Sequence, residues 1–182
     1  MQSKALNTLI KFLNNRIIEL FGITLILSSI FLLASIITYS PNDPNFLYNP
    51  GEIDIKNILG LKGSIISDFL LQSIGLISLL LIVNFFVWGI KLFKKKIIHN
   101  FISKTFFTTI YILLGTTLIF IYSNNSFWLI DNGNSGFLGR IIGESLQSFP
   151  FLDNNSYFIY VLFLLSLIFF ALSIDFKLKE FF

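Results

Sequence analysis

Long apolar runs alternate with polar segments along the chain, and this pattern predicts four membrane-spanning helices. The runs cover residues 17–39, 69–92, 106–122 and 157–174, and none carries a charge in its middle. Each is about long enough to cross a hydrocarbon core of roughly 30 Å. We therefore expect an all-α integral membrane protein, a four-transmembrane-helix bundle with two structured outer loops.

The composition agrees with one membrane domain over residues 1–182, with outer loops at about 40–66 and 123–156. Hydrophobic residues make up 54% of the chain and charged residues 13%, whereas soluble domains average about 25% charged residues. Most of the surface should therefore face lipid. The chain has no cysteine and a single histidine, His99, which excludes thiol chemistry and argues against a metal site. We expect no cofactor.

The basic residues indicate the orientation, because lysine and arginine are enriched in cytoplasmic loops. Ten of the thirteen basic residues lie in the N-terminal segment, around the loop between the second and third runs, and in the C-terminal tail. They are Lys4, Lys11, Arg16, Lys91, Lys94, Lys95, Lys96, Lys104, Lys177 and Lys179. The other two loops hold Lys56, Lys62 and Arg140 and most of the acids: Asp43, Glu52, Asp54, Asp68, Asp131, Glu144 and Asp153. Both termini should be cytoplasmic.

The Lys94–Lys96 cluster has two interpretations. It is typical of a topology signal lying against anionic lipid. The alternative is a docking patch for DNA or for a protein partner.

The first outer loop begins with a turn and leads into a second helix. Pro41 and Pro44 cannot continue a helix, and Asn42 or Asp43 can close a turn through its side chain. Further on, Gly60 and Gly63 precede the next apolar run. Ser64 or Ser67 would cap that helix, and Asp68 would then lie near its positive end. Asp68 is interpreted as a structural residue.

The second outer loop should carry a short surface helix. Gly136, Gly139 and Gly143 fall on or near one face, and such a spacing of small residues lets backbones approach closely. A surface helix fits better than a fifth span, because the segment is short and holds two charges, Arg140 and Glu144. We expect the two loops to pack on each other and on the ends of the spans, because both hold apolar residues that would otherwise lie in water, such as Phe46, Leu59, Leu61, Phe137 and Leu138.

These loops carry a recognisable pattern. Ser40-Pro41-Asn42-Asp43-Pro44 follows the first span, Asn57…Gly60…Gly63…Asp68 leads into the second, and Gly136…Gly139…Gly143 precedes the fourth. With the order and spacing of the spans, the chain resembles the N-terminal four-span membrane domain of the FtsK/SpoIIIE family of septal DNA translocases. The resemblance extends from about Ile17 to Ile174.

The resemblance implies a membrane anchor and division-site scaffold that supports cell division and chromosome segregation. It implies a septal location in the bacterial inner membrane. The implied partners are lipid, divisome membrane proteins and other copies of the chain, with DNA contacted only through a motor domain. The family's motor carries a phosphate-binding loop, and Gly60-Leu61-Lys62-Gly63-Ser64 has the wrong spacing for one. We therefore expect no enzymatic activity from this chain, which is either a membrane domain cut from a longer protein or a separate product.

Two other classes of function fit the sequence less well. A small transporter or channel subunit usually places ionisable groups inside the membrane, whereas Glu19 and Asp175 lie at span ends and Asn84 is uncharged. An intramembrane enzyme would need a catalytic set of side chains at depth. His99 at the edge of a span does not supply one.

Overall fold

A computed structural model describes residues 2–46, 51, 54–95, 97–123, 129, 132–148 and 156–176. Its elements are α1 (Gln2–Ile37), α2 (Gly60–Ile74), the 3-10 helix η1 (Gly75–Ile77), α3 (Ser78–Lys95), α4 (Phe101–Ser123), α5 (Gly136–Gln147) and α6 (Ser156–Ser173). All four prolines of the chain, at positions 41, 44, 50 and 150, fall between these helices in the sequence. The expected all-helical fold class is confirmed.

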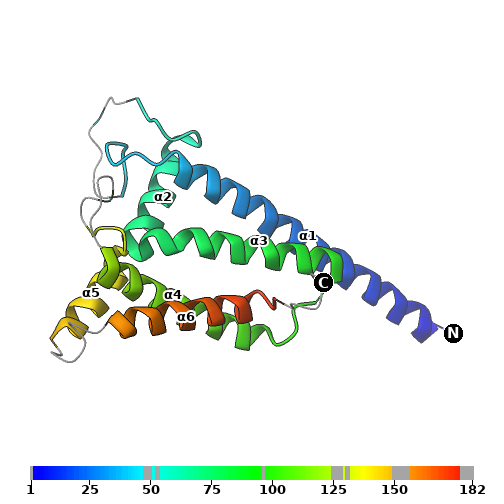
Figure 1. The fold of residues 1–182 in the computed structure, drawn as a ribbon. Helices are drawn as coiled ribbons and strands as arrows, with labels where there is room; N and C mark the ends of the chain where they lie inside the picture. Colours follow the sequence, from blue (N-terminus) through cyan, green and yellow to red (C-terminus); the bar gives the residue numbers. More distant parts are fainter. Residues whose placement is uncertain are drawn as a thin grey trace.

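The long helices pack as two antiparallel pairs. Helix α1 lies along α3, and α4 lies along α6 (Figure 1). The short helices α2 and α5 contact each other and connect the pairs at one end, which we call the cap end. The opposite end, where α3 finishes, α4 begins and α6 finishes, is called the lysine end after Lys91, Lys94 and Lys104.

Three stretches are long and apolar enough to cross a membrane: Leu6–Ile37, Gly60–Lys94 and Phe101–Ser123. The 18-residue α6 is shorter, but at 1.5 Å per residue it extends about 27 Å, close to the thickness of the hydrocarbon core. Apart from Ser156, Ser166 and Ser173, all of its residues are aliphatic or aromatic. These four stretches supply the four spans of the bundle.

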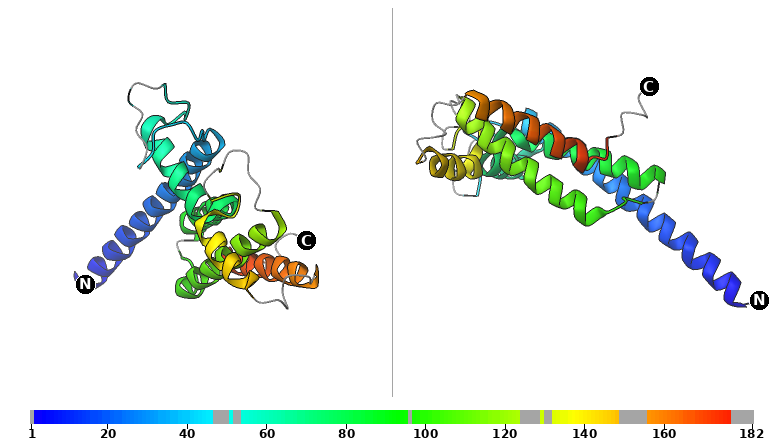
Figure 2. Two further views of the ribbon diagram at one scale, coloured as in Figure 1. Left: turned by 90° about the vertical axis from the view of Figure 1, so that its left-hand side faces the viewer. Right: turned by 60° about the horizontal axis from the view of Figure 1, so that its bottom comes forward.

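Helix α1 extends well beyond the bundle at the lysine end (Figure 2). It has 36 residues and is therefore about 54 Å long. The apolar run led us to expect a span from residue 17, whereas the helix already begins at Gln2. No glycine or proline interrupts residues 2–21, so the helix continues through the polar N-terminal segment.

A helix break within the second apolar run was not expected. Gly75 has φ +59° and separates α2 from η1 and α3, a backbone conformation that glycine adopts without steric cost. The helical direction changes sharply at this point (Figure 1). The run 69–92 therefore comprises the end of α2, the 3-10 turn and most of α3.

The α1–α3 pair is held close by two glycines that face each other. A Cβ atom added to Gly22 would lie 2.8 Å from the Gly89 carbonyl oxygen and 2.7 Å from the Phe93 nitrogen. A Cβ on Gly89 would in turn lie 2.8 Å from the Gly22 carbonyl oxygen. Small residues permit this approach, and the resulting dispersion contacts are what drive helix association in lipid.

Candidate functional site

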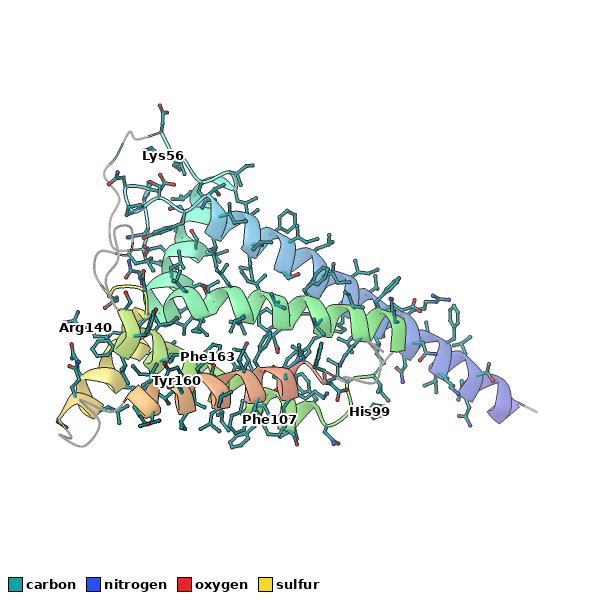
Figure 3. The ribbon with its side chains drawn as sticks, viewed as in Figure 1. Lys56, His99, Phe107, Arg140, Tyr160 and Phe163 are labelled. Atoms are coloured by element: carbon teal, nitrogen blue, oxygen red, sulfur yellow. The ribbon has the colours of Figure 1, made fainter. Side chains whose placement is uncertain are left out.

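The cap is the first candidate site, because most of the residues highlighted by the sequence analysis meet there. It consists of residues 38–46 and 54–59, α2, η1, residues 129 and 132–135, and α5. Figure 3 shows Lys56 and Arg140 at this end of the bundle and His99 at the opposite end. Side-chain hydrogen bonds to the backbone hold the first outer loop in place, and close glycine contacts hold the second.

Asp43 fixes the fold of the first outer loop. Its carboxylate accepts hydrogen bonds from the backbone N–H groups of Lys56 (3.1 Å) and Asn57 (2.8 Å), and only 2% of the residue is exposed. A buried carboxylate is costly unless hydrogen bonds of this kind satisfy it. Asp43 therefore connects the turn after α1 to residues 56 and 57, and Pro41 and Pro44 on either side of it are half-buried and buried.

Asn57 joins this loop to the helices. Its side-chain amide donates to the Ser35 carbonyl at the end of α1 (2.8 Å), and the Ser35 hydroxyl donates to the Gly63 carbonyl in α2 (2.6 Å). The Ser64 hydroxyl donates to the carbonyl of Pro44 (2.5 Å). These hydrogen bonds join the loop to α1 and to α2, and they also join the two helices to each other.

The glycines of the first loop have different roles. Gly60 has φ +63° and open space around its Cα, so its backbone conformation accounts for a glycine there. Gly63 is buried, and a Cβ atom there would lie 2.5 Å from the Cβ of Leu59 and closer still to the Asn57 side chain. Gly63 is therefore a contact residue.

Two local expectations about α2 are wrong. The helix begins at Gly60, and no side chain caps it. Ser64 and Ser67 therefore lie inside the helix, where Ser67 donates to the Gly63 carbonyl (2.8 Å). Asp68 is nine residues into α2 rather than near its positive end, and it accepts a hydrogen bond from the Tyr39 hydroxyl (3.0 Å).

The glycine face of α5 lies against α4 and the break at Gly75, with Gly136, Gly139 and Gly143 all buried. A Cβ on Gly136 would meet Gly75 and Ile74, and one on Gly143 would meet the Phe120 ring. The helix break at Gly75 is hydrogen-bonded to the segment just before α5, because the Leu76 N–H donates to the Asn134 carbonyl (2.9 Å). The second outer loop thus makes this close contact with Ile74 and η1, which lie beyond the first outer loop of about 40–66.

The expected burial of apolar loop residues is wrong for three of the five. Phe46, Leu61 and Phe137 are 76%, 47% and 54% exposed, and Leu59 and Leu138 are half-buried. Phe137 and Ile141 lie on the side of α5 away from its glycines. The cap is therefore held together by small residues and hydrogen bonds, and it leaves apolar side chains on its surface.

A second candidate site is the polar cluster at the lysine end, where α6 finishes. The Phe176 N–H donates to the Ala171 carbonyl (2.9 Å) and the Asp175 N–H to the Leu172 carbonyl (3.2 Å), and Asp175 has φ +54°. This is the Schellman arrangement, in which glycine is usual at the left-handed position. Asp175 occupies that position here.

The carbonyl groups at the end of α6 are satisfied by side chains of α3. Trp88 donates its indole N–H to the Ser173 carbonyl (2.9 Å), and the Lys91 ammonium donates to the carbonyls of Ile174 (2.5 Å) and Asp175 (3.3 Å). The last carbonyls of a helix have no partner within it, and a cation there is favoured by the helix dipole. These bonds attach α6 to α3.

The Asp175 carboxylate also brings α4 into the cluster. It forms ion pairs with Lys104 (3.0 Å) and Lys91 (3.3 Å), and the Lys104 side chain is only 7% exposed. The hydrogen bond from Lys104 holds the pKa of Asp175 below its usual value, and the charges of Lys91 and Lys104 add to this effect while partial burial opposes it. One turn deeper, the Ser173 hydroxyl donates to the buried Asn84 side chain (2.6 Å).

The sequence analysis placed Asp175 at a span end but missed its partners, Lys91 and Lys104. A usable signal was present, since an acid and two lysines lie at the same predicted end of three spans. The Lys94–Lys96 cluster is only partly described: Lys94 is exposed. Several charges used for the orientation lie outside the described residues, namely Glu52, Lys96, Asp131, Asp153, Lys177 and Lys179. In the part of the chain that the structure describes, no three acidic or histidine side chains are grouped as metal ligands.

These features define an integral membrane protein of four helical spans with a structured cap at one end. A family model described as the 4TM region of DNA translocase FtsK/SpoIIIE matches residues 14–182. The chain belongs to this family, as the resemblance implied.

The similar curated proteins are all named DNA translocase FtsK. The chain is 26% identical over 140 residues to the protein of Rickettsia bellii, 24% over 139 to that of Mesorhizobium japonicum and 25% over 138 to that of Bradyrhizobium diazoefficiens. Each alignment covers 76% of this chain but only 18%, 15% and 16% of the relative. The chain thus matches a small part of each relative's length. No solved structure matches it.

Replacing Gly139 by leucine should destabilise the cap. A Cβ atom there would lie 2.5 Å from the Ser135 Cβ and 2.6 Å from the Thr116 carbonyl oxygen, and overpacking of this kind typically costs about 1–3 kcal/mol. Thermal unfolding in detergent should show a lower midpoint for Gly139→Leu. Gln147→Leu, at an exposed position of the same helix, is the control. Equal midpoints for wild type and Gly139→Leu would disprove the close contact.

Replacing Asp175 by asparagine should weaken the lysine end. Asparagine tolerates the left-handed backbone but cannot pair as an anion with the nearly buried Lys104, so a loss of roughly 1–3 kcal/mol is expected at neutral pH. The exposed pair Arg140–Glu144 supplies a control, because Glu144→Gln should change stability little.

The difference in unfolding free energy between wild type and Asp175→Asn should become smaller as the pH falls. The folded-state pKa of Asp175 is lowered from 3.8, so its stabilisation is present above about 3.8 and is lost as the pH falls through the lower folded-state value. Unfolding free energies of wild type and Asp175→Asn should therefore converge in acid. A gap that stays constant down to strongly acidic pH would contradict a role for the charge.

Proposed function

We propose that this chain is the membrane anchor and division-site scaffold of an FtsK-like septal DNA translocase and supplies no motor activity itself. The observation that carries the proposal is the family match over residues 14–182, together with relatives named DNA translocase FtsK. The chain would reside in the bacterial inner membrane as one domain, residues 1–182. Its partners would be lipid, divisome membrane proteins and further copies of itself, with DNA engaged only by a motor domain.

The arrangement of polar groups supports an anchor. Asp43 and Asn57 bind loop backbone and helix ends, and Asp175 and Asn84 bind neighbouring helices. In a small transporter or channel, such groups would be expected to line a path for the solute. Here their polar atoms are engaged in holding helices and loops together, which is what a rigid scaffold requires.

The cap would face outward and the lysine end would face the cytoplasm. Lys91, Lys94 and Lys104 belong to the lysine end, which is the arrangement that the preference for cytoplasmic lysine favours. The two outer loops, about 40–66 and 123–156, would then be available to divisome partners. Their shape would depend on the residues singled out earlier: Pro41, Asp43, Pro44, Gly60, Gly63, Asp68, Gly136, Gly139 and Gly143.

Cysteine labelling tests this orientation directly, because the chain has no cysteine of its own. A cysteine in place of the exposed Lys56 should react with a membrane-impermeant maleimide added from outside intact spheroplasts. A cysteine in place of the exposed His99 should react only after the membrane is opened. The reverse pattern would invert the proposed topology.

A fluorescent fusion tests the septal role. Residues 1–182 fused to a fluorescent protein at the C-terminus should gather at midcell in a dividing bacterium. Comparison with the same fusion carrying Gly139→Leu tests whether localisation at midcell depends on an intact cap. Uniform membrane fluorescence throughout constriction, from a fusion shown to be folded by its thermal unfolding, would contradict the scaffold proposal.

A further inference from the structure

An apolar groove lies between α1 and α2 near the cap end. It has a volume of about 260 Å³ and is lined on the α1 side by Ser28, Phe31, Leu32 and Ser35, and on the other side by Leu59, Lys62, Gly63 and Ile66. Two of its polar groups are already used, since the Ser35 hydroxyl donates to the Gly63 carbonyl (2.6 Å). Gly63 has no side chain to fill the space. The groove surface is therefore almost entirely apolar.

A single cation stands at the rim of this groove. Lys62 is exposed, and its ammonium group has neither an ion-pair nor a hydrogen-bond partner among the described residues. A lysine at the end of a span places its ammonium at the level of the lipid headgroups, because the hydrocarbon core excludes charge. Ser28 lies seven residues before Ser35 on α1, so the groove extends about 10 Å from this level toward the hydrocarbon.

We propose that this groove is a binding site for an anionic glycerophospholipid, with one acyl chain between α1 and α2 and its phosphate beside Lys62. The acyl chain would lie along Ser28–Ser35, between Phe31 and Ile66, which are 56% and 44% exposed. An apolar slot with one cation at its headgroup end is complementary to an amphiphile with an anionic head. A helix from another protein fits less well, because its apolar surface would cover Lys62 without supplying an anion.

The lipid headgroup, rather than the acyl chain, determines the selectivity of this site. Bulk lipid is as apolar as the groove, so transferring an acyl chain into it gains little. One lysine near a membrane surface favours an anionic lipid about fivefold. The site should therefore be distinguished by its preference among headgroups and by its sensitivity to the shape of the groove. Neither property depends on the proposed septal role or on the orientation of the chain.

Native mass spectrometry of the detergent-solubilised chain tests the proposal. The protein would be titrated with equal amounts of phosphatidylglycerol and phosphatidylcholine of the same acyl chains. Wild type should retain phosphatidylglycerol preferentially. Lys62→Gln should reduce that preference about fivefold, whereas Lys56→Gln, which removes an exposed lysine outside the groove, should leave it unchanged. Equal preferences in wild type and Lys62→Gln, or an equal loss in Lys56→Gln, would overturn the site.

Substitutions that fill the groove give an independent test of lipid binding. Ser28→Leu should remove the retained lipid of either headgroup, whereas Thr109→Leu, at an exposed position on α4, should not. A photo-reactive amino acid in place of Phe31 should crosslink to lipid in cell membranes. Crosslinking to a protein in place of lipid, or lipid retention unaffected by Ser28→Leu in a folded variant, would overturn the proposal in favour of a helix-docking surface or an unoccupied groove.

Discussion

The absence of water in the hydrocarbon core is the constraint on which this structure depends. Every backbone N–H and C=O group that a helix end or break exposes must find its partner within the protein. The break at Gly75 meets this requirement through the bond from the Leu76 N–H to the Asn134 carbonyl. The end of α6 meets it through Trp88 and Lys91. The hydrogen bonds that satisfy these backbone groups also connect segments far apart in the sequence. The same bonds therefore satisfy the backbone and hold the bundle together.

The second principle of the assembly is close approach through small residues. Lipid removes most of the hydrophobic drive for helix association, which leaves dispersion contacts and interhelical hydrogen bonds. Gly22 and Gly89 bring α1 and α3 together, Gly136 brings the start of α5 close to Gly75, and Gly139 brings α5 close to α4. Larger apolar side chains are left outside, as Phe46 and Phe137 show. The same chemistry thus explains both the tight interior contacts and the apolar surface, which suits a lipid environment.

The fold class could be predicted because the apolar runs and their helical lengths are local properties. The glycine face of α5 could be predicted for the same reason, since three glycines at helical spacing identify a face. The break at Gly75 could not, because a lone glycine inside an apolar run is compatible with a continuous helix, and Asn134, which accepts the bond from Leu76, lies 58 residues further along the sequence. Asp175 has no local signal either, and only the predicted spans, which bring it to the same end as Lys91 and Lys104, could have suggested the pairing. Contacts between distant segments depend on the tertiary arrangement, which a single sequence does not specify.

The Schellman end of α6 has a mechanical consequence. Phe176, the last described residue, directly follows a residue that is tied to α3 by Lys91 and to α4 by Lys104. A pulling force applied to the following residues therefore reaches three helices at once and does not peel α6 away alone. Two ion pairs and the capped carbonyls would have to break together before the helix could unwind. The position of Asp175 thus makes the end of α6 the place where tension is shared across the bundle.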